Sequence, residues 1–184
     1  KIAKESNRIS VKVLDEAAAK RMGMNAFLAV ASGSDREPYF IHLTYRPVKK
    51  AKKSIALVGK GVTFDSGGLS LKPSDSMMTM KMDMAGAATV LGVFSSLGDL
   101  QPAVEVHGII AACENMPSGS AYRPGDVVRA MNGTSIEVLN TDAGGRVTMA
   151  DSLSYASQLE PNAIIDLATL TGACVVALGE EIVG

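Results

Sequence analysis

Residues 54–68 read SIALVGKGVTFDSGG, and this stretch decides the fold that we expect. Ser54–Val58 is a short apolar run that Gly59 stops, which is typical of a strand buried in a parallel sheet. Glycines and polar residues follow at once, among them Lys60 and Asp65. In open α/β sheets, sites form where parallel strands end. The stretch therefore predicts a parallel sheet with a functional site at its edge.

The rest of the chain alternates between strand and helix patterns. Apolar or alternating runs predict strands at Ile9–Leu14, Tyr39–Tyr45, Val104–Ala112 and Ala163–Leu167, the last of them buried. Apolar residues at helical spacing predict helices at Asp15–Met24, Met84–Leu100 and Val147–Gln158. A hairpin of Val127–Ala130 with Ser135–Leu139 is expected around Asn132-Gly133. Together these patterns favour an α/β fold with a largely parallel mixed sheet flanked by helices.

Composition places the chain among ordinary globular proteins. Its 184 residues suffice for one domain, and a hydrophobic content of 47% supports a sizeable core. The net charge of −1 gives no support to nucleic-acid or membrane binding, and no apolar run reaches the roughly 18 residues of a membrane span. Cys113 and Cys174 lie in apolar surroundings, which predicts buried, reduced thiols in a cytoplasmic protein. Lys1 is not an initiator methionine and Gly184 closes an apolar stretch, so we expect a fragment of a longer polypeptide.

Unusual polar residues gather in three segments, 58–72, 80–84 and 139–146. The glycine-rich first segment fits neither common phosphate-binding frame, because G-x-x-x-x-G-K-[ST] is absent and Phe64 stands where the third glycine of G-x-G-x-x-G would be. An H-E-x-x-H zinc pair is also absent, since His42 and His107 are the only histidines. Local sequence alone leaves two alternatives, a site or tight turns with Asp65 as a cap.

Longer motifs favour the site. The chain reads NTDAGGR at 140–146, DLATLTGA at 166–173 and MDM at 82–84, and a lysine-containing loop runs from Gly59 to Lys72. These residues resemble the catalytic domain of the leucine (cytosol) aminopeptidase family of two-metal exopeptidases, whose hallmark is NTDAEGR. The resemblance implies that residues 1–184 are a partial catalytic domain, with a separate N-terminal domain and the C-terminal part of the catalytic domain lying outside them.

By position, the resemblance implies a site for two divalent metal ions, zinc or manganese first, with magnesium or cobalt as alternatives. The implied ligands are Lys60 as a neutral amine, Asp65 as a bridge between both ions, Asp83 at the tighter site and Asp142 at the more exchangeable one. Hard oxygen ligands suit these ions. Two ions about 3.5 Å apart can share a water, lower its pKa and polarise the carbonyl that it attacks.

The resemblance also implies the groups that act on substrate. Lys72 would lie over the scissile carbonyl, where its charge stabilises the developing oxyanion. Arg146 would hold a bicarbonate ion that serves as general base. The implied substrate contacts are Met80, Thr169, Leu170 and Gly172. The expected reaction is release of N-terminal leucine and other apolar residues from peptides with a free N-terminus, by a homohexamer in the cytoplasm.

Gly144 departs from the family pattern, which has a glutamate at this position that bridges both metals. Without it the ligands Asp65, Asp83 and Asp142 carry −3 against the +4 of two divalent ions. Even an indirect partner of a metal is worth roughly 10–100-fold in affinity or activity, so losing a direct bridge should cost at least as much. Gly144 followed by Gly145 is also expected to loosen this loop. The alternative function is a catalytically inactive relative with an assembly or binding role.

Overall fold

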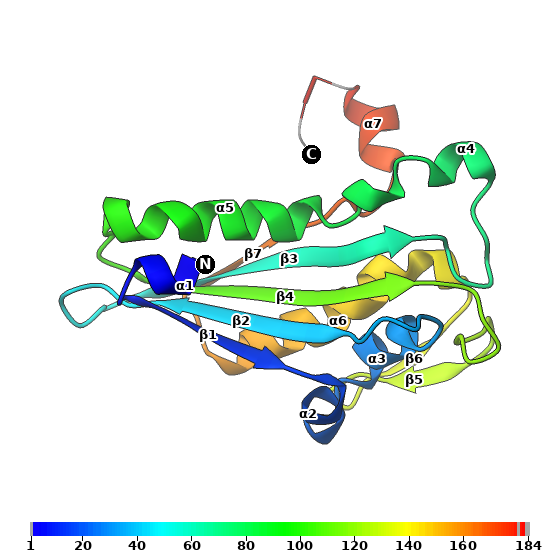
Figure 1. The fold of residues 1–184 in the computed structure, drawn as a ribbon, viewed down its shortest axis with the longest axis horizontal. Helices are drawn as coiled ribbons and strands as arrows, with labels where there is room; N and C mark the ends of the chain where they lie inside the picture. Colours follow the sequence, from blue (N-terminus) through cyan, green and yellow to red (C-terminus); the bar gives the residue numbers. More distant parts are fainter. Residues whose placement is uncertain (1, 180, 183–184) are drawn as a thin grey trace.

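A computed structural model describes residues 2–179 and 181–182, in which helices cover both faces of a central sheet (Figure 1). The expectation of a fragment rests on the two terminal residues, Lys1 and Gly184. Both lie outside the described residues. The sheet strands are β1 (Ile9–Leu14), β2 (Tyr39–Tyr45), β3 (Ser54–Asp65), β4 (Glu105–Asn115) and β7 (Ala163–Leu167), in the order β1-β2-β4-β3-β7. β1, β2 and β4 pair antiparallel, whereas β3 runs parallel to both β4 and β7. The expected α/β class with a mixed sheet is confirmed.

The remaining elements connect or cover these strands. The helices are α1 (Ile2–Glu5), α2 (Glu16–Arg21), α3 (Asn25–Ala31), α4 (Ser74–Met77), α5 (Ala85–Leu100), α6 (Gly144–Gln158) and α7 (Ala173–Leu178), with short 3-10 turns η1 (Met80–Met82) and η2 (Thr141–Ala143). Strands β5 (Val127–Arg129) and β6 (Ser135–Glu137) form the expected antiparallel hairpin. None of the helices in the described part of the chain is long and apolar enough to span a membrane.

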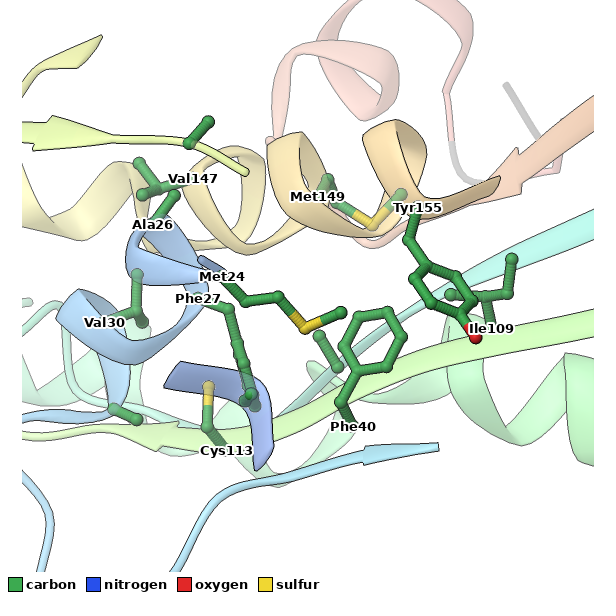
Figure 2. Close-up of a cluster of buried hydrophobic side chains, with 14 of the residues drawn as sticks. Met24, Ala26, Phe27, Val30, Phe40, Ile109, Cys113, Val147, Met149 and Tyr155 are labelled. Carbon is green, nitrogen blue, oxygen red and sulfur yellow. The ribbon is translucent and has the colours of Figure 1, made fainter. Parts of the chain in front are cut away.

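Two hydrophobic cores hold the layers together, one on each face of the sheet. On the α3 and α6 face, the Phe40 ring meets Phe27 and Tyr155 edge to face, with centroids 6.1 and 5.1 Å apart (Figure 2). On the other face, α5 buries Val90 and Phe94. Successive residues of a strand point to opposite faces, so the continuous apolar runs of β3 and β4 supply both cores.

Gly59 does not end β3, which corrects the sequence-based boundary. The strand continues to Asp65 because Gly59 and Gly61 stand where neighbouring backbone approaches closely. A Cβ on Gly59 would lie 2.7 Å from the Cα of Ala87 in α5, and one on Gly61 would lie 2.7 Å from the carbonyl oxygen of Ala111 in β4. These glycines permit close packing within the sheet, and Lys60 is therefore a strand residue between them.

Four other expectations need correction. The helix expected at Asp15–Met24 is the shorter α2, which ends at Arg21, and the chain turns at Gly23 with a φ of +73° before α3, which was not expected. Helix α6 begins three residues before Val147. β7 is exposed rather than buried, because among the described residues it pairs only with β3. Cys113 is buried as expected, but Cys174 is exposed.

Candidate metal and catalytic site

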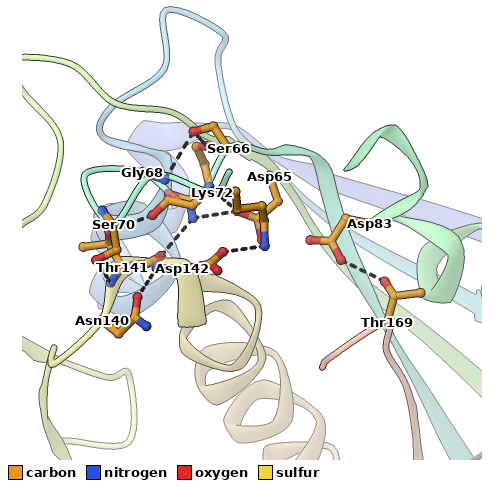
Figure 3. Close-up of polar contacts among 12 residues, drawn as sticks. Asp65, Ser66, Gly68, Ser70, Lys72, Asp83, Asn140, Thr141, Asp142 and Thr169 are labelled. Atoms are coloured by element: carbon orange, nitrogen blue, oxygen red, sulfur yellow. Dashed lines mark hydrogen bonds and ion pairs between the residues drawn. The ribbon is translucent and has the colours of Figure 1, made fainter. Parts of the chain in front are cut away.

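The candidate site lies at the carboxyl ends of β3 and β4, next to η2 and the start of α6. Asp65 is the last residue of β3 and stands opposite Asn115, the last residue of β4. Asp83 follows η1, and Asp142 lies within η2. The parallel pairing of β3 and β4 thus brings together segments that are far apart along the chain (Figure 3).

One half of the site is a buried group built around Lys60, whose side chain is 3% exposed. Its Nζ donates hydrogen bonds to Asp83 Oδ1 at 2.6 Å and to the carbonyl oxygen of Thr169 at 2.8 Å. The Thr169 hydroxyl donates to the same oxygen of Asp83 at 2.9 Å. Burial raises the pKa of Asp83 to about 6, against the opposing pull of Lys60. The ionised form of Asp83 is therefore stabilised by its contact with Lys60.

Asp65, Lys72 and Asp142 form the other half. Asp65 is 2% exposed, and its Oδ1 accepts from the backbone N–H of Gly67 and from Asn115 Nδ2, both at 2.9 Å. Lys72 Nζ lies 2.5 Å from Asp142 Oδ1. Burial alone would lower the pKa of Lys72, but Asp142 and the more distant charges of the other two aspartates outweigh it, and the pKa is raised. Lys72 therefore stays positive, because the charges of all three carboxylates raise its pKa.

Hydrogen bonds tie the two loops of this half together. Thr141 Oγ1 donates to the carbonyl oxygen of Gly67 at 2.7 Å and accepts from the backbone N–H of Ser70 at 2.7 Å. The Ser70 hydroxyl accepts in turn from the N–H of Thr141 at 3.1 Å. Asn140 caps η2 by accepting from the N–H of Asp142 at 2.8 Å. The loop after β3 and η2 are therefore held as one unit.

The other predicted residues lie around this centre with fewer contacts. Arg146 is exposed in the first turn of α6. Its side chain makes no hydrogen bond or ion pair to any other described residue. Met80 opens η1, and its carbonyl oxygen accepts from the N–H of Asp83 at 3.4 Å. Leu170 is 46% exposed and Gly172 is also exposed, both between β7 and α7. Among the described residues, Thr169 is the only predicted substrate contact whose side chain forms a hydrogen bond with a proposed metal ligand.

Comparison with known proteins assigns the chain to a family. The model of the cytosol aminopeptidase family, catalytic domain, matches residues 1–184. The chain belongs to the cytosol aminopeptidase family. It is 63% identical to a probable cytosol aminopeptidase of Persephonella marina over 174 residues, which are 95% of this chain and 35% of that protein. Those of Sulfurihydrogenibium sp. and Aquifex aeolicus are 60% and 59% identical over 184 residues, all of this chain and 36% and 37% of those proteins. The chain thus spans little more than a third of the length of these relatives.

The donor atoms of this cytosol aminopeptidase domain fit hard divalent cations. Asp83 Oδ2 is buried without a hydrogen-bond partner in the described structure, so it is a free acceptor beside Lys60. No group of three or more His, Cys, Asp or Glu side chains within the described residues is arranged to hold a metal ion. The ammonium groups of Lys60 and Lys72 supply the positive charge that faces the three aspartates.

Gly144 is packed in a way that corrects the expectation of a loosened loop. Gly144 and Gly145 are buried in the first turn of α6, and Gly144 has helical angles of φ −55° and ψ −35°. A Cβ on Gly144 would lie 2.9 Å from Asn115 Nδ2 and 3.2 Å from the Tyr122 hydroxyl. A Cβ on Gly145 would lie 2.6 Å from Lys60 Nζ. Both glycines thus allow close contact with site side chains.

The sequence-based assignment missed Asn115, which contacts the proposed ligand Asp65, and Tyr122, which supports η2 beside it. Both donate to the carbonyl oxygen of Thr141, at 3.0 and 2.7 Å respectively. A polar residue at the end of an apolar strand is the signal that identified Asp65, and Asn115 carries the same signal. It was overlooked because the expected strand stopped at Ala112, three residues before β4 ends.

Proposed function

We propose that this chain supplies most of the metal site and the catalytic lysine of an aminopeptidase that releases N-terminal leucine and other apolar residues from peptides. One observation carries the proposal: the buried Lys60 amine meets Asp83 within a site where Lys72 is held positive by three aspartates. A buried lysine between two strand glycines is costly as a purely structural choice. Membership of the cytosol aminopeptidase family and relatives named probable cytosol aminopeptidases support the same reaction.

The proposed cofactors are two divalent ions, zinc or manganese in the first place and magnesium or cobalt as alternatives. The residues that would hold them are Lys60, Asp65, Asp83 and Asp142. When bound, such a pair lowers the pKa of a shared water and polarises the carbonyl that it attacks. Lys60 can join the ligand set only after it loses a proton, because an ammonium has no lone pair to donate. Asp83 must itself be ionised to bind a metal, so the proton of Lys60 would leave to solvent.

The chain's own residues supply the remaining chemistry. Lys72 is a half-buried group whose pKa is raised by Asp142 and the other aspartates, so its positive charge can stabilise negative charge that develops on a carbonyl oxygen. Arg146 presents an exposed, planar guanidinium, which suits a bidentate contact with a planar anion such as bicarbonate. Met80 and Leu170 offer apolar surface for a substrate side chain, with Thr169 and Gly172 beside them. Peptides with a free N-terminus are the proposed substrates, and a cytoplasmic homohexamer is the proposed assembly.

The second candidate, a relative that binds without catalysis, rests on Gly144. This position carries no side chain to bridge two metals, and Asn115 and Tyr122 leave little space around its Cα. Under this alternative the chain retains the fold of the site and fails to hydrolyse peptides when it is loaded with metal.

Titration with Mn²⁺ followed by calorimetry tests the leading proposal. We expect about two ions per chain, as in two-metal hydrolytic sites. Asp83→Asn should weaken binding, whereas Asp99→Asn, an exposed change in α5 away from the site, should not. Failure of the parent chain to bind Mn²⁺ or Zn²⁺ at saturation would refute the proposal.

Hydrolysis of a leucyl anilide by metal-loaded parent and Gly144→Glu chains then separates the two candidate functions. No hydrolysis by the parent chain favours the inactive relative. Activity gained in the variant identifies the missing side chain as the cause.

A further inference from the structure

Asn115 connects two segments of the site that the chain keeps far apart. It is fully buried at the end of β4. Its Nδ2 donates to Asp65 Oδ1 at 2.9 Å and to the carbonyl oxygen of Thr141 at 3.0 Å. A side-chain amide has two N–H donors, so both are used, one on the end of β3 and one on η2.

The direction of the amide follows from its neighbours. Asp65 Oδ1 and the Thr141 carbonyl oxygen are both acceptors, so a flipped amide would place Asn115 Oδ1 against both of them and lose both hydrogen bonds. In the present orientation Asn115 Oδ1 is buried without a hydrogen-bond partner in the described structure. A buried polar atom without a hydrogen-bond partner is unfavourable, because it has lost its contacts with water. The position is therefore better explained by its two donors than by packing alone.

We propose that Asn115 is a positioning residue, which orients the carboxylate of Asp65 relative to the loop that carries Asp142. Two N–H groups, from Asn115 and Gly67, converge on one oxygen of Asp65 and hold the carboxylate in one orientation. This inference rests on the proposed metal-binding function and adds a residue to it. Partners that orient a metal ligand are typically worth 10–100-fold in affinity.

Gly144 is coupled to Asn115 by the same geometry. A Cβ at Gly144 would lie 2.9 Å from Asn115 Nδ2, closer than a carbon normally approaches, and the amide cannot withdraw without losing a hydrogen bond. Gly144 therefore leaves room for Asn115 in the orientation that holds Asp65.

Tyr122 offers a matched control. Its hydroxyl donates to the same Thr141 carbonyl oxygen at 2.7 Å but makes no hydrogen bond to Asp65 in the described structure. Tyr122→Phe removes one bond to η2, whereas Asn115→Leu removes a bond to η2 and the bond to Asp65 while keeping a side chain of similar size. The difference between the two variants isolates the contact with Asp65.

The experiment measures Mn²⁺ affinity by calorimetry and, without metal, the urea midpoint of unfolding for the parent chain and each variant. We expect Asn115→Leu to fold and to bind Mn²⁺ about 10–100-fold more weakly, and Tyr122→Phe to bind like the parent. If the parent binds no Mn²⁺, the proposed function fails and takes this inference with it. If the parent binds, equal affinities of parent and folded Asn115→Leu overturn the inference alone, as do equal losses in Asn115→Leu and Tyr122→Phe. Should Asn115→Leu not fold, Asn115→Ala decides, because it removes both donors without adding volume, and parent-like affinity in that variant overturns the inference.

Discussion

Gly145→Ala should destabilise the chain even though alanine is the better helix former. Alanine for glycine in a helix gains at most about 1 kcal/mol. The new Cβ would lie 2.6 Å from Lys60 Nζ and 3.1 Å from Lys60 Cδ, and closer still to Lys60 Cε. Overpacking of this kind costs about 1–3 kcal/mol. Moving Lys60 away strains its hydrogen bonds to Asp83 and Thr169, and a bond to a charged group is worth about 1.5–3 kcal/mol. We expect a net loss of about 3 kcal/mol.

Urea unfolding followed by circular dichroism measures this loss, and Gly92→Ala is the matched control. Gly92 is also a helical glycine, but it is exposed in α5 and a Cβ there would meet no atom within 4 Å. That variant should gain about 0.5–1 kcal/mol from the glycine replacement alone. Equal stabilisation by Gly145→Ala and Gly92→Ala would refute the contact between α6 and Lys60 and, with it, the described position of the buried amine.

Two further predictions concern titration and thiol access. Burial lowers the pKa of His42 from 6.5 to about 4, so the neutral ring is favoured in the folded state, and its contribution to stability is complete above pH 6.5 and lost as the pH falls towards 4. His42→Gln should make the free energy of unfolding less dependent on pH between 7 and 4.5, and an unchanged dependence would contradict the assignment. An aromatic disulfide reagent should modify the exposed Cys174 quickly and the buried Cys113 only on unfolding, so rapid release of two equivalents from the native chain would rule out this burial pattern.

The fold could be predicted from sequence wherever a local pattern is strong. β1, β2 and β7 have the expected bounds, and the hairpin lies around the expected turn. The errors lie at Gly59 and Gly23, where the same residue type had opposite consequences. Gly59 continues a strand because α5 packs against it, whereas Gly23 takes a positive φ and separates two helices. Local sequence cannot distinguish a glycine needed for close packing from one needed for a turn, because the neighbouring helix or strand comes from a distant segment.

The candidate site was predictable as a set of residues and not as a set of contacts. The resemblance to the cytosol aminopeptidase family implied Lys60, Asp65, Asp83 and Asp142 as metal ligands. It did not indicate that Lys60 contacts Asp83 or that Lys72 contacts Asp142. The sequence also led to the wrong expectation for the Gly144-Gly145 pair, which is buried helix and not a loosened loop.

Sequence by itself therefore determined the class of the fold, the family and the chemical groups available, because periodicity and motif depend on residues close together in the chain. Only the tertiary structure decided which carboxylate each lysine meets and that Asn115 lies between Asp65 and Thr141. It also decided that a side chain at Gly144 would press on Asn115. For Asn115 the physical reason is the pairing of β3 with β4, because the register of these strands places it beside Asp65, which is fifty residues earlier in the chain.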